Sequence, residues 1–173
     1  MSSEARFRSL IEQSPLSTQI FSTDGETIRV NRAWEELWGA SWKEVGSYNI
    51  LKDSQLERKG IMSYILKAFG GEATTIPTVL YDPAEIGKKG QIRSVRGYIY
   101  PVKTPDGRVR EVVLMHEDIT EQVRAEVQAK RQTAALHELH AISTLPGLDD
   151  QKRFDEVVAS MASFFSVRVY SGR

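Results

Sequence analysis

The pattern of apolar and polar residues changes its period near residue 109. Residues 109–116 are mostly β-branched or apolar, which predicts a strand buried on both faces. Residues 121–144 are rich in charge, which predicts a solvated helix. Asp118 or Thr120 could cap that helix, because a short side-chain oxygen accepts hydrogen bonds from the free N–H groups of a first turn. A strand that leads into a long helix can transmit a change from inside a domain to its outside.

Turn and breaker residues divide the preceding part of the chain into short elements. Asp24-Gly25 and residues 105–107 are typical of tight turns between antiparallel strands. Asn31 is placed to cap a helix that Gly39 ends. The predicted elements are a helix over residues 7–12, strands over 17–23 and 26–31, helices over 32–38 and 55–69, and strands over 74–81, 92–103 and 108–117. This order predicts an α+β domain with about five antiparallel strands.

Several short motifs in these elements occur in a recognisable order. They are F-R-S-L-I-E at residues 7–12, Asp24-Gly25, V-N-R-A-W-E-E-L-W-G at 30–39, Pro101, Asp106-Gly107 and D-I-T-E at 118–121. In this order they resemble PAS sensor domains, in which D-I-T-E closes the domain and opens an output helix. The resemblance covers about residues 7–125. It implies a five-stranded antiparallel sheet with helices on one face, around an internal cavity.

The resemblance also implies which face of the last strand points inward. Side chains alternate along a strand, so Val112, Leu114 and His116 share one face. In flavin-binding, light-sensing relatives, the position of His116 carries a glutamine that faces the cofactor and relays its state. We therefore expect His116 to face the cavity and to read a ligand or a proton, since histidine titrates near neutral pH. The alternative is a structural histidine bonded to the backbone.

The site that the resemblance implies has two parts. The cavity walls would be Phe21, Met62, Ile65, Leu66, Phe69, Ile99, Val112, Leu114 and His116. The signal relay would be Asp118, Ile119 and Thr120. For the helix over residues 55–69, the alternative is that its apolar side chains fill the core themselves.

Three tryptophans, at positions 34, 38 and 42, follow one another at intervals of four residues. They could form an aromatic cage or a flavin platform, but we expect them to pack one helix face into the core, with Trp42 partly exposed. Two cofactors are disfavoured by the resemblance. The position of the flavin-adduct cysteine is Asn49, and no histidine precedes His116 to bind haem. The cofactor stays unknown: a small organic ligand, a non-covalent flavin or no ligand.

Composition narrows the class of protein further. The chain of 173 residues has 23 basic and 23 acidic side chains, so no basic surface is predicted for nucleic acid or an anionic membrane. It has no cysteine, and no cluster with metal-ligand spacing. No apolar run reaches the about 20 residues that span a bilayer, and no signal peptide is recognisable. We expect a cytoplasmic protein.

Two lysine- or histidine-containing motifs are weak. G-K-K-G at residues 87–90 lacks the spacing of a phosphate-binding loop and predicts a solvated turn. The histidines of H-E-L-H at 137–140 are three residues apart rather than four, so this is no zinc-protease motif. A histidine-kinase phosphoacceptor would carry Leu-Arg and a proline after H-E, which this segment does not. We expect two solvated histidines.

The sequence predicts three parts: a PAS sensor domain over residues 1–120, a signalling helix over 121–144, and an amphipathic helix over 145–173. Residues 134–168 resemble the opening helices of a GAF domain. The apolar positions of the signalling helix are Val123, Val127, Leu136, Leu139 and Ile142, an imperfect coiled-coil seam. It predicts a homodimer, although the helix could instead dock on its own sheet.

The expected function is a sensor and dimerisation module that relays a change in its core to an output domain not in this chain, in cis or in trans. The alternative is a ligand-free module that only assembles proteins. We expect no enzyme and no catalytic residue, because no nucleophile and base, or matched pair of carboxylates, can be placed together from the sequence.

Overall fold

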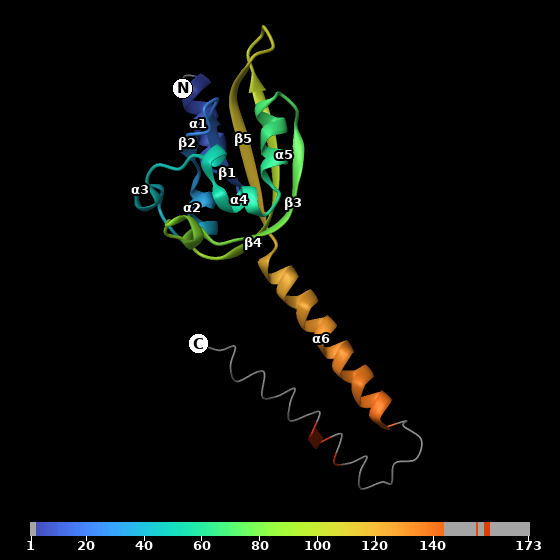
Figure 1. Ribbon diagram of the computed structural model, residues 1–173. Coiled ribbons are helices and arrows are strands. Elements are labelled where there is room, and N and C mark those ends of the chain that lie inside the picture. Colours follow the sequence, from blue (N-terminus) through green and yellow to red (C-terminus); the bar gives the residue numbers. More distant parts are fainter. Residues whose placement is uncertain (1–2, 144–154, 156–157, 160–173) are drawn as a thin grey trace. The chain divides into compact units, whose positions relative to one another are not determined.

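The computed structural model describes residues 3–143, 155 and 158–159. The chain divides after Glu121 into two units, which are described separately. The elements in chain order are α1 (Ser3–Glu12), β1 (Ser17–Ser22), β2 (Thr27–Val30), α2 (Arg32–Trp38), α3 (Trp42–Val45), the 3-10 helix η1 (Ile50–Lys52), α4 (Ser54–Arg58), α5 (Met62–Phe69), β3 (Thr74–Tyr81), the 3-10 helix η2 (Pro83–Ile86), β4 (Arg93–Lys103), β5 (Val109–Asp118) and α6 (Thr120–Ser143) (Figure 1).

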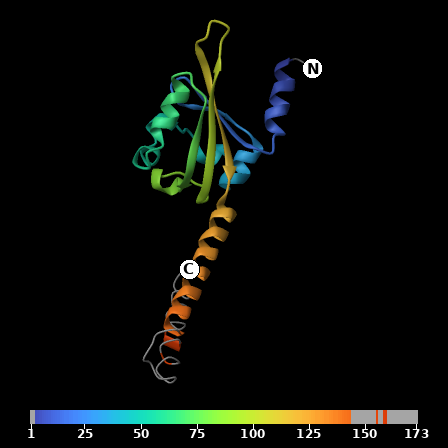
Figure 2. The same ribbon diagram turned by 90° about the vertical axis from the view of Figure 1, so that its right-hand side faces the viewer.

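The first unit is built on a five-stranded antiparallel sheet with the order β2-β1-β5-β4-β3. The last strand of the chain, β5, therefore lies at the centre, between β1 and β4. Figure 2 shows α4 and α5 on one side of the sheet and α1 on the other. Apolar side chains from the inner face of the sheet and from α2, α4 and α5 form one core. The predicted α+β class, the five strands and both hairpin turns are confirmed.

The prediction of one continuous helix over residues 55–69 is wrong. The chain instead forms α4 and α5, separated by Gly60, whose φ of 71° is a left-handed conformation that glycine adopts at little cost. Asp53 defines the start of α4, because its Oδ1 accepts the backbone N–H groups of Gln55 and Leu56 at 2.8 and 3.2 Å. The chain thus changes direction at the edge of the core through two short helices in place of one long helix.

Asn31 joins three elements at the bottom of the core. Its Oδ1 accepts the backbone N–H groups of Thr18 in β1 and Trp34 in α2, at 2.9 and 3.0 Å. Its Nδ2 donates to the backbone carbonyls of Ile11, Ser14 and Leu16. Asn31 is 1% exposed; the two bonds that its Oδ1 accepts are buried, and the three that its Nδ2 donates are part-buried. The predicted N-cap role is confirmed, as is the end of α2 at Gly39.

The second unit begins at Gln122, within α6. Two of its predicted seam residues, Val127 and Leu136, are 43% and 68% exposed. Glu126 and Lys130 form an i,i+4 ion pair at 2.7 Å. Most of the GAF-like segment over residues 134–168, and nearly all of residues 145–173, lies outside the described residues. Within the described part of the chain, no helix is long and apolar enough to cross a membrane.

The buried network at Asn31 generates a stability prediction. Asn31→Ala should lower the free energy of unfolding by about 2–4 kcal/mol, because buried backbone N–H groups lose their acceptor. Asn49→Ala is the matched control, since Asn49 caps η1 with one part-buried bond from the Leu51 N–H and its other two bonds are exposed to solvent. It should cost less than half as much. Urea denaturation of both variants measures the difference, and equal losses would contradict the role given to Asn31.

Candidate functional site

A cavity of about 70 Å³ lies between the inner face of the sheet and the helices that cover it. Its walls come from all the strands except β2, from α2, α3, η1, α4 and α5, from the segment 83–89, and from the connecting residues Tyr48 and Ile61. Most of the wall is aliphatic or aromatic. Engineered apolar cavities of about 150 Å³ hold a benzene molecule. This cavity therefore accommodates a group of a few non-hydrogen atoms, and a flavin ring system would require the walls to move.

The predicted wall residues fall into three groups. Ile65, Leu114 and His116 line the cavity. Phe21, Ile99 and Val112 do not line it, because they are fully buried in the adjoining part of the core. Met62 and Phe69 pack, partly buried, against that core.

Leu66 is a correction, since its side chain is 55% exposed and does not reach the cavity. The reason lies in the face that α5 buries. Ile65 and Ala68 are fully buried, and Leu66 follows Ile65 at about 100° around the helix, on its outer side. The helical period correctly located the apolar face of α5, but it wrongly included Leu66 in the part of that face that is buried.

The sequence prediction missed several aromatic wall residues. Trp34 and Trp38 are buried core residues, as expected, but both also line the cavity. Trp42 is partly buried and meets Trp34 edge to face, with ring centroids 6.0 Å apart. Tyr48 and Tyr81 line the cavity as well. Tyr48 comes from an irregular segment without periodicity, so no sequence pattern indicated it.

His116 stands where the cavity meets the lower end of β5. Its Nδ1 lies 3.1 Å from the Oγ of Ser17, which is its cross-strand neighbour in β1. Its ring packs edge to face on Trp38 at a centroid distance of 5.5 Å. Within the described residues, Nε2 has no hydrogen-bond partner, and His116 lines the cavity. Desolvation by burial lowers the pKa of His116 to about 4, and the ring is neutral at pH 7.

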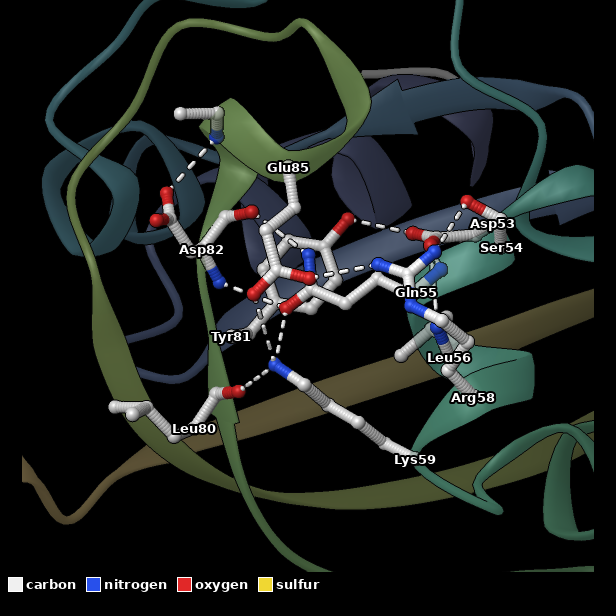
Figure 3. Close-up of polar contacts among 11 residues, drawn as sticks. Asp53, Ser54, Gln55, Leu56, Arg58, Lys59, Leu80, Tyr81, Asp82 and Glu85 are labelled. Carbon is white, nitrogen blue, oxygen red and sulfur yellow. Dashed lines mark hydrogen bonds and ion pairs between the residues drawn. The ribbon is translucent and has the colours of Figure 1, made fainter.

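A buried carboxylate holds two of the aromatic wall residues in place. Asp53 is 3% exposed, and its Oδ2 accepts the hydroxyl protons of Tyr48 and Tyr81 at 2.7 and 2.6 Å. Figure 3 shows the bond between Tyr81 and Asp53. Burial, reinforced by the charge of Asp53, raises the pKa of both tyrosines, so they remain donors at neutral pH. The tyrosine rings are thereby fixed as a rigid part of the wall.

The segment 82–90 closes one side of the cavity and is bonded firmly at its start. Gln55 is fully buried and forms two hydrogen bonds with the backbone of Asp82 (Figure 3). The Nε2 of Gln55 donates to the carbonyl of Asp82 at 2.7 Å, and the Oε1 of Gln55 accepts the N–H of Asp82 at 2.9 Å. Arg58 and Lys59 contact Glu85 at 2.8 and 3.5 Å.

The other end of this segment is solvated as predicted at Gly87, Lys89 and Gly90, which are exposed, but not at Lys88. Lys88 is only partly exposed, lines the cavity, and donates to the backbone carbonyls of Val45 and Ser47 at 3.2 and 2.6 Å. These contacts join residues more than forty positions apart. The local sequence around Lys88 therefore could not predict these two contacts.

The predicted relay residues form a tight junction with β4. Ile119 and Thr120 are buried, and the Ile119 N–H donates to the backbone carbonyl of Ser94 at 2.9 Å. The hydroxyl of Thr120 accepts the Ser94 N–H at 3.0 Å and lies 2.5 Å from the Oδ1 of Asp118. Of the two candidate caps, Asp118 accepts the backbone N–H of Thr120, the first residue of α6, at 2.9 Å. Thr120 instead fastens the start of the helix to the sheet.

A second contact reaches the same junction from α2. The Nε of Arg93 donates to the backbone carbonyl of Leu37 at 2.9 Å and lies 3.8 Å from the Oδ2 of Asp118. The C-terminal end of α2, which carries Trp38, is therefore connected through one side chain to the acid that begins α6. Within the described residues, no group of three or more His, Cys, Asp and Glu side chains is arranged to hold a metal ion.

Comparison with solved structures shows where this architecture recurs. An RNA-binding light-oxygen-voltage receptor matches with a TM-score of 0.58 and 21% identity, over 80% of this chain but only 38% of that receptor. The PAS domain of Bordetella pertussis BvgS matches with a TM-score of 0.51 and 22% identity, over 80% of this chain and 98% of that domain. The Rhodobacter sphaeroides LOV protein matches with a TM-score of 0.53 and 11% identity, over 100% of this chain and 99% of that protein. At these identities the likeness concerns the fold.

The sequence itself also matches a family model. No curated protein sequence matches the chain significantly. The model described as PAS fold matches residues 11–124, which include the whole sheet, the cavity and the junction at Thr120. The sequence motifs, the strand order and this match agree, and the chain belongs to the PAS fold family.

Proposed function

We propose that this chain is a sensory and dimerisation module. It detects a small ligand, or another change, in the cavity and relays that change through Asp118, Ile119 and Thr120 to an output domain outside this chain, in cis or in trans. One observation carries the proposal: the same strand bears His116 at the cavity and ends at the buried junction with Ser94. Membership of the PAS fold family supports a sensory role.

The relay would work through the position of β5 relative to β4. His116 lies opposite Gly97 in β4, and Ser94, three residues earlier on the same strand, receives the bonds of Ile119 and Thr120. A ligand that bonds to the Nε2 of His116 acts on one end of this short ladder. Such a ligand moves the junction at Ser94 only if the paired strands β4 and β5 have two arrangements and the ligand binds one of them more tightly than the other.

The partner proposed is a second copy of the chain. Val127 and Leu136 expose apolar surface on α6, and pairing with the same helix of another copy would cover it. The module is proposed to act in the cytoplasm and to have no catalytic activity, nucleic-acid partner or membrane partner. Balanced formal charge supports the last two points.

A second candidate function is a ligand-free interaction module. The observation that favours it is the small size of the cavity, about 70 Å³, because most of the core is already filled by its own side chains. In that case the sheet and α6 would serve only to assemble proteins.

Native mass spectrometry of the purified protein separates the two functions. Sensing predicts a dimer that carries a stoichiometric small molecule, which is lost when Leu114→Phe fills the cavity. Leu10→Phe, an exposed position on α1, is the matched control and should retain the molecule. A dimer of bare polypeptide mass in every preparation favours the interaction module, and a monomer contradicts the proposed partner.

The junction generates a prediction about Thr120. Thr120→Val should lower the free energy of unfolding by about 1–3 kcal/mol, because the buried N–H of Ser94 loses its acceptor. The same variant should speed hydrogen exchange at the Ser94 amide. Thr120→Ser keeps the hydroxyl and is the control. If the two variants are equally stable and exchange equally, the hydroxyl does not fasten α6 to the sheet.

The low pKa of His116 generates a prediction about pH. The unfolded histidine, with a pKa near 6.5, binds a proton more readily than the folded one, with a pKa of about 4. The free energy of unfolding is therefore unaffected by this histidine above pH 6.5, and it decreases as the pH falls towards 4, because the unfolded chain then takes up a proton that the folded chain does not. Between these values the wild type should lose up to about 3 kcal/mol more than His116→Gln, which cannot titrate. Denaturation curves across this range test it, and parallel losses in both proteins would refute it.

A further inference from the structure

One cation in the cavity wall has no negative partner. Lys88 donates to two neutral backbone carbonyls, those of Val45 and Ser47. Within the described residues, no carboxylate lies within ion-pair distance of its ammonium group. Lys89, its neighbour, differs, because it contacts Glu44 at 3.5 Å. An ammonium group has three N–H donors, so one donor of Lys88 is left for a further acceptor.

Lys88 also stands at a boundary between two hollows. Beside the apolar cavity lies a polar surface hollow of about 310 Å³, and the residues that line both are Tyr48, Ile86 and Lys88. The surface hollow is also lined by the carboxylates of Glu26 and Asp53, which accept hydrogen bonds from Asn49 and from both tyrosines, and by a second ammonium group, that of Lys52. An anion that reaches this boundary would meet the ammonium of Lys88, and partial burial strengthens that attraction.

The two ends of the segment 82–90 differ in how they are held. Its start is fixed by the two hydrogen bonds between the buried Gln55 side chain and the backbone of Asp82. Its other end is held by the two Lys88 contacts, by the ion pair of Lys89 with Glu44 and, just beyond the segment, by the bond from the Gln91 N–H to the carbonyl of Trp38. The Lys88 contact to Ser47 and both side chains of the ion pair are exposed to solvent. A ligand could therefore pass from the surface hollow into the cavity if only the Lys88 end moved, while Tyr81 and Asp53 kept the rest of the wall in place.

We propose that the cavity binds a small carboxylate with a short, branched hydrocarbon body. The carboxylate accepts the third N–H of Lys88, and the body occupies the apolar space beside Ile65 and Leu114. A volume of about 70 Å³, half of what holds benzene, limits that body to roughly three or four carbon atoms. The inference rests on the proposed function, because it uses the same cavity.

The test compares two probes of equal shape, 3-methylbutanoate and 3-methylbutanamide, by isothermal titration calorimetry at neutral pH. The wild type should bind the carboxylate at least about tenfold more tightly than the amide, because only the carboxylate carries a negative charge that pairs with the ammonium of Lys88. Lys88→Gln keeps a donor for the carbonyls of Val45 and Ser47 but removes the charge. It should reduce the preference to less than about twofold.

Lys43→Gln is the matched control, because Lys43 is an exposed lysine on α3 that lines neither hollow. It should keep the full preference for the carboxylate. Leu114→Phe should abolish binding of both probes, which places them in the cavity. The wild-type comparison of the two probes needs no variant, so it decides the anion preference even if Lys88→Gln does not fold.

Equal affinity of the two probes for the wild type overturns the inference, and so does a preference that survives Lys88→Gln. If both probes bind equally and Leu114→Phe removes them, the carboxylate inference fails while a sensing cavity stands. If neither probe binds, the inference fails, and a co-purifying molecule in native mass spectrometry still decides the proposed function separately.

Discussion

The backbone of Ser94 is the point on which this structure depends. It receives the N–H of Ile119 and donates its own N–H to the hydroxyl of Thr120, and all three residues are buried. A buried backbone group without a partner is costly, so these bonds set where β5 ends and where α6 begins. Because β5 is the central strand, it is paired with β1 as far as His116 and with β4 as far as Asp118. The start of the helix and the floor of the cavity are thereby parts of one hydrogen-bonded ladder.

Polar anchors fix several of the large rings in the cavity wall. Asp53 fixes Tyr48 and Tyr81 by their hydroxyls, and Trp34 donates its indole N–H to Gln19 at 2.9 Å. Each of these hydrogen bonds restricts the orientation of a ring in the wall. The cavity is small and largely apolar, with His116 at one side and the ammonium of Lys88 at another.

The sequence predicted the regular parts of this arrangement and missed the parts that depend on long-range contacts. Strand alternation correctly placed Leu114 and His116 on one common face, because period two holds wherever a strand is regular, and the resemblance to PAS domains correctly chose that face as the inner one. Helical periodicity located Ile65 but misplaced Leu66, since it does not specify how wide the buried face is. Lys88 was read as solvated because its partners lie far away in the sequence. The relay and the dimer remain predictions, which no contact within this chain can test.

The central claim is that the cavity and the start of α6 are energetically coupled although His116 and Thr120 do not touch. A double-mutant cycle with His116→Gln and Thr120→Val measures this coupling in the free energy of unfolding. The account predicts that the two losses are non-additive by at least about 0.5 kcal/mol. Additivity within about 0.3 kcal/mol would contradict it, because distant and independent sites add to within that range.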